Sequence, residues 1–228
     1  MWTKIHPEKV LVNLGRKGSR TISATVINGK VDLAPMTLQE NDLWSEHVGG
    51  AGFIEMGAIA NFGANTGLVT PAVQAAIDSW LVAQGIHAAR EHEALPLACT
   101  GAGFHHDVDY KNELFCVVWL SDNMPWDVYF PYIDMRIPLE YGTIFVFDSL
   151  QPHGVVPRGA SVFDASSFEY GTGVFASQDL IIDCKSCALM GIKKYSCKGK
   201  RGMHILDAEN VQDSLSPETA EWHIRRVE

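Results

Sequence analysis

The chain has 228 residues, and its 46% content of hydrophobic residues is enough to build the core of one large domain. A formal net charge of −9 argues against a nucleic-acid partner, because an acidic field repels phosphate backbones. The five cysteines are too few and too scattered for a secreted disulfide scaffold, and no apolar run reaches the roughly 18 to 20 residues that span a bilayer. We therefore expect a single cytoplasmic domain over residues 1–228 with no membrane partner, and its oligomeric state is left open.

The first part of the chain predicts a β-hairpin. Residues 21–26 and 31–33 alternate between apolar and polar side chains, and Asn28-Gly29 between them is a pair favoured in two-residue hairpin turns. Residues 49–67 are rich in glycine but lack the spacing of a dinucleotide or phosphate loop. We interpret this stretch as a series of bends that allow close packing.

A helix is predicted from residue 71. Thr70 can cap it, and Pro71 suits the first helical position. Apolar side chains then recur at helical spacing, at Val73, Ala76, Ile77, Trp80 and Leu81. We expect this helix to end near Gly85 and to cover the outer face of a sheet.

Short apolar segments separated by turns follow the helix. The run at 114–120 is continuous, which is typical of a strand covered on both faces, whereas 128–139 contains two prolines and predicts an edge or irregular strand. Further strands are expected at 97–100, 104–108, 144–147 and 180–183. This succession predicts a mainly β sandwich or barrel with few helices.

Three potential metal ligands lie within this strand-rich region. If residues 104–108 are extended, alternation places His105 and Asp107 on one face and His106 on the other. His153 follows the strand at 144–147 and offers a third ligand. Two imidazoles and one carboxylate on one side of a metal leave positions open opposite them, which suits non-haem Fe(II) and its reaction with oxygen.

These residues resemble the Fe(II)- and 2-oxoglutarate-dependent dioxygenases, in which His-x-Asp is followed, some tens of residues later, by a distal histidine and a basic residue. His105, Asp107 and His153 match that pattern, and the segment from Gly142 to Gly154 resembles a strand-turn-strand unit of that family. The resemblance covers roughly residues 97–185. It implies a double-stranded β-helix core of the jelly-roll or cupin-like type, with a few flanking helices, an N-terminal hairpin and helix, and a basic C-terminal tail.

The resemblance also implies the chemistry. Fe(II) would bind the three ligands, O2 and 2-oxoglutarate would be co-substrates, and 2-oxoglutarate would be converted to succinate during hydroxylation or oxidative demethylation of an unidentified small molecule or protein side chain. An arginine is suited to hold the distal carboxylate of 2-oxoglutarate. Arg158, with the hydroxyl of Ser161, is the first candidate and Arg136 is the competitor; many relatives carry the basic residue where this chain has Phe163 and Asp164.

Two other functions are kept as alternatives. A cupin-type metal dioxygenase or isomerase would use the barrel and the metal without 2-oxoglutarate. A non-catalytic cupin-like binding module would use the barrel to hold a ligand or partner, and the basic stretch at 185–201 could contact an acidic one or be a solvated loop.

The C-terminal part offers two further hypotheses. A structural zinc site is one, because this region contains Cys184, Cys187, Cys197 and His204, although only one Cys-x-x-Cys pair is present. Residues 216–218 resemble the cap and first turn of a short terminal helix.

Overall fold

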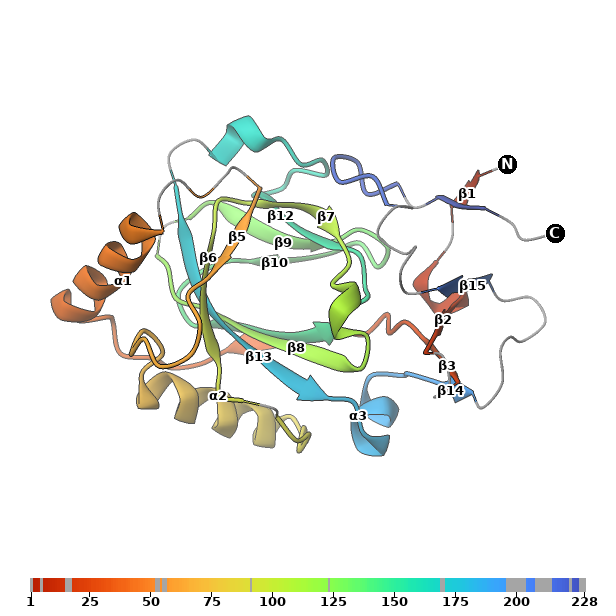
Figure 1. Ribbon diagram of the computed structural model, residues 1–228, viewed down its shortest axis with the longest axis horizontal. Helices are drawn as coiled ribbons and strands as arrows, with labels where there is room; N and C mark the ends of the chain where they lie inside the picture. Colours follow the sequence, from red (N-terminus) through yellow and green to blue (C-terminus); the bar gives the residue numbers. More distant parts are fainter. Residues whose placement is uncertain are drawn as a thin grey trace.

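The computed structural model describes residues 2–225 except 5, 15–17, 52–53, 55–56, 91, 123, 169–170, 196–203, 208–214 and 222. Eight consecutive strands form two facing antiparallel sheets (Figure 1). They are β6 (Leu95–Cys99), β7 (Ala102–His105), β8 (Glu113–Trp119), β9 (Trp126–Phe130), β10 (Met135–Pro138), β11 (Thr143–Asp148), β12 (His153–Pro157) and β13 (Gly173–Ile181).

The order of these strands is that of a double-stranded β-helix. The smaller sheet has the order β10-β9-β12-β7, and the larger one contains β11-β8-β13-β6. Most connections therefore cross from one sheet to the other, as in a jelly roll. The larger sheet is extended at its edges by β4 (Ile27–Lys30) and β5 (Ile59–Asn61). The predicted fold class, mainly β with few helices, is confirmed.

Strand alternation separates two apolar layers. In β8, Phe115, Val117 and Trp119 face the space between the sheets. Leu114, Cys116 and Val118 alternate with them and belong to the core on the other side of the larger sheet. The continuous apolar run in this segment is explained by burial on both faces, as predicted.

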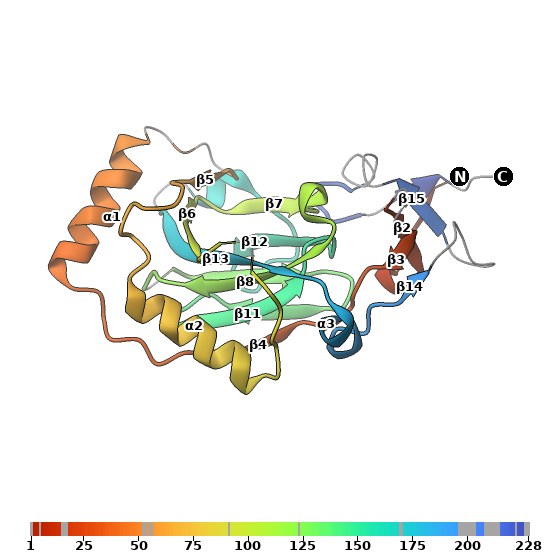
Figure 2. The ribbon, with the colours of Figure 1, turned by 60° about the horizontal axis from the view of Figure 1, so that its bottom comes forward.

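One long helix, α2, runs along the outer side of the larger sheet, and another, α1, lies at one end of the strands (Figure 2). Helix α2 (Pro71–Ala83) begins at the predicted cap, where the Thr70 hydroxyl accepts a hydrogen bond from the Val73 backbone N–H, and it ends before Gly85, whose φ is +74°. Helix α1 (Leu38–Gly50) was not predicted. Its first turn carries a reciprocal capping box between Thr37 and Glu40, a pattern visible in the sequence.

The predicted N-terminal hairpin is wrong. Asn28 and Gly29 lie inside β4, which pairs with β11 so that Asn28 is opposite Phe145. Gly29 is needed there for a different reason than a turn: a Cβ atom at this position would lie 2.8 Å from the Trp80 Nε1 atom of α2. The predicted strand at 128–139 is divided into β9 and β10, and only β10 lies at a sheet edge.

Both ends of the chain contribute to a third sheet, which lies at one end of the molecule (Figure 1). Strands β2 (Val10–Asn13), β3 (Ser19–Thr21), β14 (Lys194–Tyr195) and β15 (His204–Asp207) form it, while β1 (Trp2–Lys4) pairs with β16 (His223–Arg225). The remaining helical segments are η1 (Pro7–Lys9), η3 (Val108–Tyr110), η4 (Ala165–Phe168) and α3 (Cys184–Leu189).

The structure describes only part of the basic stretch at 185–201, and it does not contain the helix predicted at 216–218. The described part of the basic stretch forms α3 and β14, and residues 196–201 lie outside the described residues. The predicted terminal helix at 216–218 is wrong, because residues 217–219 form a turn that leads towards β16. None of the described helices is long and apolar enough to cross a membrane.

Candidate metal centre

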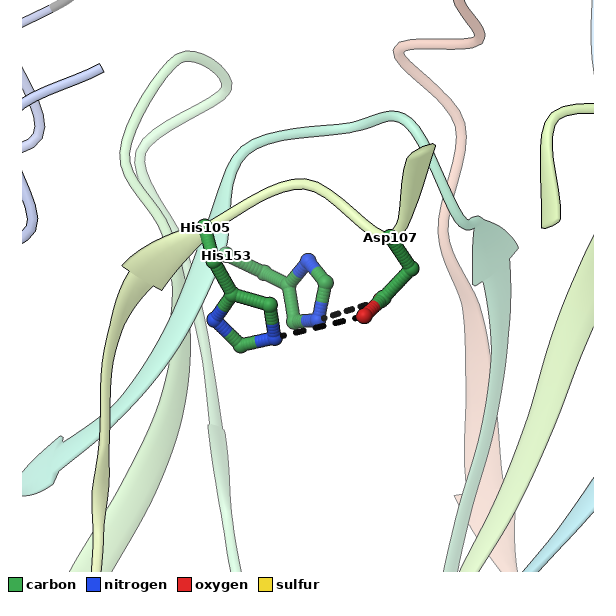
Figure 3. A group of neighbouring side chains, drawn as sticks. All are labelled: His105, Asp107 and His153. Carbon is green, nitrogen blue, oxygen red and sulfur yellow. Dashed lines mark ion pairs between the residues drawn. The ribbon is translucent and has the colours of Figure 1, made fainter. Parts of the chain in front are cut away.

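Three side chains meet at one end of the space between the sheets (Figure 3). His105 is the last residue of β7, Asp107 follows in the link to η3, and His153 is the first residue of β12. One ligand atom from each of the three residues lies within 4.8 Å of the other two. The structure therefore brings together the His-x-Asp pair and the distal histidine that the sequence singled out.

Strand pairing positions the two imidazoles. His105 and His153 are direct partners in the antiparallel pairing of β7 with β12, and their ring centroids are 4.3 Å apart. Facing residues of adjacent strands are the closest side-chain neighbours in a sheet, which explains how positions distant in sequence become adjacent. Phe147 packs edge-on against His153, with ring centroids 4.6 Å apart.

Hydrogen bonds determine which nitrogen of each ring faces the centre. The Nδ1 atom of His105 lies 2.7 Å from the carbonyl oxygen of Gly103, and that of His153 lies 2.8 Å from the carbonyl oxygen of Gln151. A carbonyl oxygen can only accept, so each Nδ1 carries the hydrogen and each Nε2 has its lone pair available. A backbone acceptor on the outer nitrogen is the usual support of a metal-binding imidazole.

The carboxylate of Asp107 lies between the two Nε2 atoms. Its Oδ1 is 3.6 Å from Nε2 of His105, and its Oδ2 is 3.3 Å from Nε2 of His153. The backbone N–H of Asp107 donates to the carbonyl oxygen of Ser149, which holds this residue in place after β7 has ended. His106 points away, is buried and donates from Nδ1 to the carbonyl oxygen of Leu150.

Burial makes charge unfavourable at this centre. Desolvation raises the pKa of Asp107, and the neighbouring His105 offsets part of that effect. Desolvation, with a smaller contribution from His105, also lowers the pKa of His153 well below its usual range. A divalent cation binds the neutral form of an imidazole and the ionised form of a carboxylate. A cation at this centre would therefore stabilise the negative charge that burial disfavours on Asp107.

The donor set fits Fe(II). Two imidazole nitrogens and one carboxylate oxygen on one side of an ion leave positions open for further ligands, and this set is typical of non-haem Fe(II) oxygenases. In the described part of the chain, no other group of three histidine, cysteine or acidic side chains comes close enough to hold a metal ion.

The metal centre opens into a cavity of about 280 Å³ between the sheets. Its walls are mostly apolar side chains that alternate along the larger sheet, including Leu95, Leu97, Phe115, Val117, Trp119, Phe145, Phe147 and Phe175. Ile59 and Tyr110 also line it and are 45% and 40% exposed, so they form part of an apolar rim. Such a cavity is suited to an apolar ligand with few polar groups.

Two polar residues of β13 that the sequence analysis did not select line this cavity. Ser177 and Asp179 alternate with Phe175 on the inner face of the strand. Asp179 lies 3.2 Å from Nε2 of His92, and its charge contributes to the raised pKa of Asp107. Strand alternation could have found both residues if the strand had been predicted to begin at Gly173.

The candidates for binding 2-oxoglutarate lie elsewhere. The Arg158 side chain is outside the cavity, with Nε 3.5 Å from Asp127 and Nη1 3.8 Å from Glu140. Arg136 stacks on Tyr129, with its guanidinium carbon 3.7 Å from the ring centroid, and donates to the hydroxyl of Ser161 at 3.1 Å.

None of these candidates lines the cavity, and neither does any other described lysine or arginine. Arg158 instead pairs with Asp127 of β9 and with Glu140 between β10 and β11, and Arg136 contacts Tyr129 of β9 and Ser161 in the loop after β12. Binding of 2-oxoglutarate by Arg158 and Ser161, or by Arg136, therefore stays a prediction, and no described lysine or arginine lies inside the cavity to pair with the distal carboxylate.

The zinc hypothesis is only partly within the described residues. Cys184 is exposed and Cys187 is buried, both in α3, and neither forms a disulfide. Cys197 lies outside the described residues, and the side chain of His204 is also not described. The zinc site therefore stays a prediction.

No protein-family model and no curated protein sequence matches the chain. Solved structures do match it. The chain is similar to a viral collagen prolyl hydroxylase from Paramecium Bursaria Chlorella virus-1, in a complex with 2OG, at 14% identity over 68% of this chain and 94% of that one, with a TM-score of 0.45. A prolyl-4-hydroxylase from Pseudomonas putida matches at 14% identity over 69% and 93% of the two chains, with a TM-score of 0.44.

A third match is AviO1 from Streptomyces viridochromogenes Tue57, at 9% identity over 71% of this chain and 91% of that one, with a TM-score of 0.42. At these identities, any assignment of function depends on the arrangement of this chain's own residues.

Proposed function

We propose that this protein is a mononuclear Fe(II) oxygenase that uses O2 and a 2-oxo acid to oxidise a C–H bond of an apolar group. One observation carries the proposal: His105, Asp107 and His153 form a three-ligand centre in the wall of an apolar cavity. The other polar groups of the cavity are few, so the chemistry is concentrated at this centre.

The residues of the chain have distinct parts in this function. His105, Asp107 and His153 would hold Fe(II), which when bound supplies the reaction with O2 that protein side chains cannot perform. The carbonyl oxygens of Gly103 and Gln151 orient the two imidazoles. Aromatic side chains such as Phe147 and Phe115 exclude water from the space beside the metal.

The net reaction balances without a further reductant. A 2-oxo acid, O2 and a substrate C–H bond give a carboxylate shortened by one carbon, CO2 and a C–OH group, so the 2-oxo acid supplies two electrons. Hydroxylation is the direct outcome, and oxidative demethylation follows when the oxidised carbon is a methyl group on nitrogen or oxygen. The substrate is a small molecule or a protein side chain whose apolar part fits the cavity.

Substitution of the carboxylate ligand tests the metal centre. We expect Asp107→Asn to weaken Mn(II) binding by more than about 100-fold, because an amide cannot offer the anionic oxygen that a hard divalent ion prefers. Mn(II) binding is measured anaerobically from the loss of the paramagnetic resonance signal of the free ion. Asp109→Asn is the matched control, since Asp109 is exposed and lies only two positions away.

The wild-type protein and Asp109→Asn should each bind one Mn(II) per chain. Equal binding by Asp107→Asn and wild type would refute the proposed centre, because the ion would then be held elsewhere.

A second candidate function is favoured by the lack of a lysine or arginine among the described cavity-lining residues. A cupin-type metal dioxygenase or isomerase would use the same centre without any 2-oxo acid. The two functions are separated by measuring CO2 release: a 2-oxo acid oxygenase releases CO2 from 1-labelled 2-oxo acids in an Fe(II)-dependent reaction, and the alternative does not.

A further inference from the structure

No lysine or arginine of the described residues lines the cavity. Along β13, Phe175, Ser177 and Asp179 face inward, and the neighbouring β8 presents Phe115, Val117 and Trp119. Among the described lining residues, the only side chains that can carry positive charge are the two histidines of the metal centre. The described wall that the larger sheet contributes is therefore apolar apart from Ser177, Asp179 and Asn61.

The cavity has a polar end and an apolar end. Asp179 is paired with Phe115 of β8, Phe115 is paired with Phe147 of β11, and Phe147 packs against His153, which places this part of β13 at the metal end. Phe175 lies four residues earlier on the same face, about 13 Å along the strand at ~3.3 Å per residue. There Phe175 stacks on Trp119, with ring centroids 5.6 Å apart and an interplanar angle of 12°.

A dicarboxylate would fit this wall poorly. Chelation of a metal through the keto-acid end leaves the second carboxylate to be buried further inside, where it meets the apolar side chains of β8 and β13. A buried anion without a cationic partner is strongly disfavoured, whereas an alkyl group in the same place gains from leaving water.

The indole N–H of Trp119 is a neutral donor at the apolar end. The indole side chain of Trp119 lines the cavity and is 2% exposed, and its Nε1–H has no hydrogen-bond partner among the described residues. A buried donor of this kind indicates a ligand with an uncharged acceptor or a small polar group nearby. A single neutral N–H does not compensate the charge of a carboxylate as an arginine fork does.

We propose that the cavity selects, as the ligand of its metal, a 2-oxo acid with an uncharged apolar side chain rather than the dicarboxylate 2-oxoglutarate. This inference rests on the proposed function, since it requires the metal at His105, Asp107 and His153. The selection is made by the side chains of β8 and β13 and not by the metal ligands.

The test compares two ligands of similar shape. In 5-methyl-2-oxohexanoate an isopropyl group replaces the distal carboxylate of 2-oxoglutarate, so the pair differs mainly in charge. Binding to the Fe(II)-loaded protein is measured anaerobically by calorimetry. We expect the apolar ligand to bind at least about tenfold more tightly. Equal or tighter binding of 2-oxoglutarate to the wild-type protein overturns the inference.

A variant that introduces a cation should reverse the preference. Phe175→Arg keeps a planar group that can stack on Trp119, and we expect it to tighten 2-oxoglutarate binding by at least about tenfold. Phe175→Met is the control, because it changes the packing without adding charge and should keep the wild-type order of affinities. Circular dichroism checks the fold of both, and the wild-type comparison decides the inference if Phe175→Arg does not fold.

Failure of the inference and failure of the proposed function give different results. A protein that holds Fe(II) at the triad but prefers 2-oxoglutarate overturns only the selectivity inference. A protein whose Fe(II) binding is unchanged in Asp107→Asn has no metal centre at the triad, and this result overturns both.

Discussion

At the scale of single residues, His106 contrasts with the two histidines beside it. It is buried, its Nδ1 donates to the carbonyl oxygen of Leu150, and burial lowers its pKa from the ordinary 6.5 to about 3. Desolvation is the main cause of this lowered pKa; the hydrogen bond to Leu150 opposes it, and His105 makes a smaller contribution in the same direction as desolvation. His106 is therefore neutral in the folded protein at pH values where it is protonated in the unfolded chain.

This difference predicts acid sensitivity of the metal-free protein. As pH falls from 6.5 towards 3, the unfolded state takes up a proton at His106 that the folded state does not, so the free energy of unfolding decreases by up to about 1.4 kcal/mol per pH unit for this residue. His106→Asn should make the decline shallower by that amount. Urea unfolding at pH values from 4 to 7 measures both slopes, and identical slopes would show that His106 does not titrate in this way.

The sequence predicted the metal ligands of the site better than it predicted the cation for 2-oxoglutarate. His105 and Asp107 converge although β7 ends at His105. The backbone N–H of Asp107 donates to the carbonyl oxygen of Ser149, and this contact holds the carboxylate near His105 outside the regular strand. The role of Arg158 could not be judged from its position after His153. Its direction depends on Asp127 and Glu140, which approach it only in the folded molecule.

At the scale of elements, a buried ion pair joins the sheet formed by β2, β3, β14 and β15 to the double-stranded β-helix. Arg20 of β3 donates two hydrogen bonds, of 2.6 and 2.8 Å, to the carboxylate of Asp148 at the end of β11, and both side chains are fully buried. Asp148 also accepts from the backbone N–H groups of Ser23 and Leu150. The pair thus fixes the start of the loop that leads to His153.

Loss of one partner should be strongly destabilising. We expect Arg20→Met to lower the free energy of unfolding by about 3–5 kcal/mol, because it leaves the carboxylate of Asp148 buried without its cation. Lys30→Met, which removes the exposed pair between Lys30 and Glu140, is the control and should change stability by no more than about 1 kcal/mol. Chemical denaturation compares the two variants, and a loss for Arg20→Met as small as the control's would show that the pair adds little.

Element prediction succeeded where one short segment contains all the information. Helix α2 has its cap, its first-turn proline and its apolar stripe within a single segment, so its start was predictable. The turn chemistry of Asn28-Gly29 was misleading, because Gly29 is required by the approach of Trp80 from α2 and not by a turn. That requirement comes from tertiary packing, which alternation within residues 21–33 does not contain.

At the scale of the whole molecule, the resemblance predicted more than the local patterns did. Alternation and turns indicated a sandwich or barrel. The order of the eight strands could be expected only from the resemblance of the sequence to a family with a double-stranded β-helix. The pairing of β2 with β15 and of β1 with β16 could not be predicted, because it joins segments from opposite ends of the chain. The apolar cavity likewise depends on side chains from both sheets.

The central claim is that three residues from β7, the link after it and β12 form one Fe(II) centre inside this fold. Anomalous X-ray scattering at the iron edge, from crystals of the protein loaded with Fe(II) without oxygen, tests it most directly. We expect one strong iron peak at bonding distance from Nε2 of His105, Nε2 of His153 and a carboxylate oxygen of Asp107. Iron located away from these atoms, or a protein that binds no iron, would contradict it.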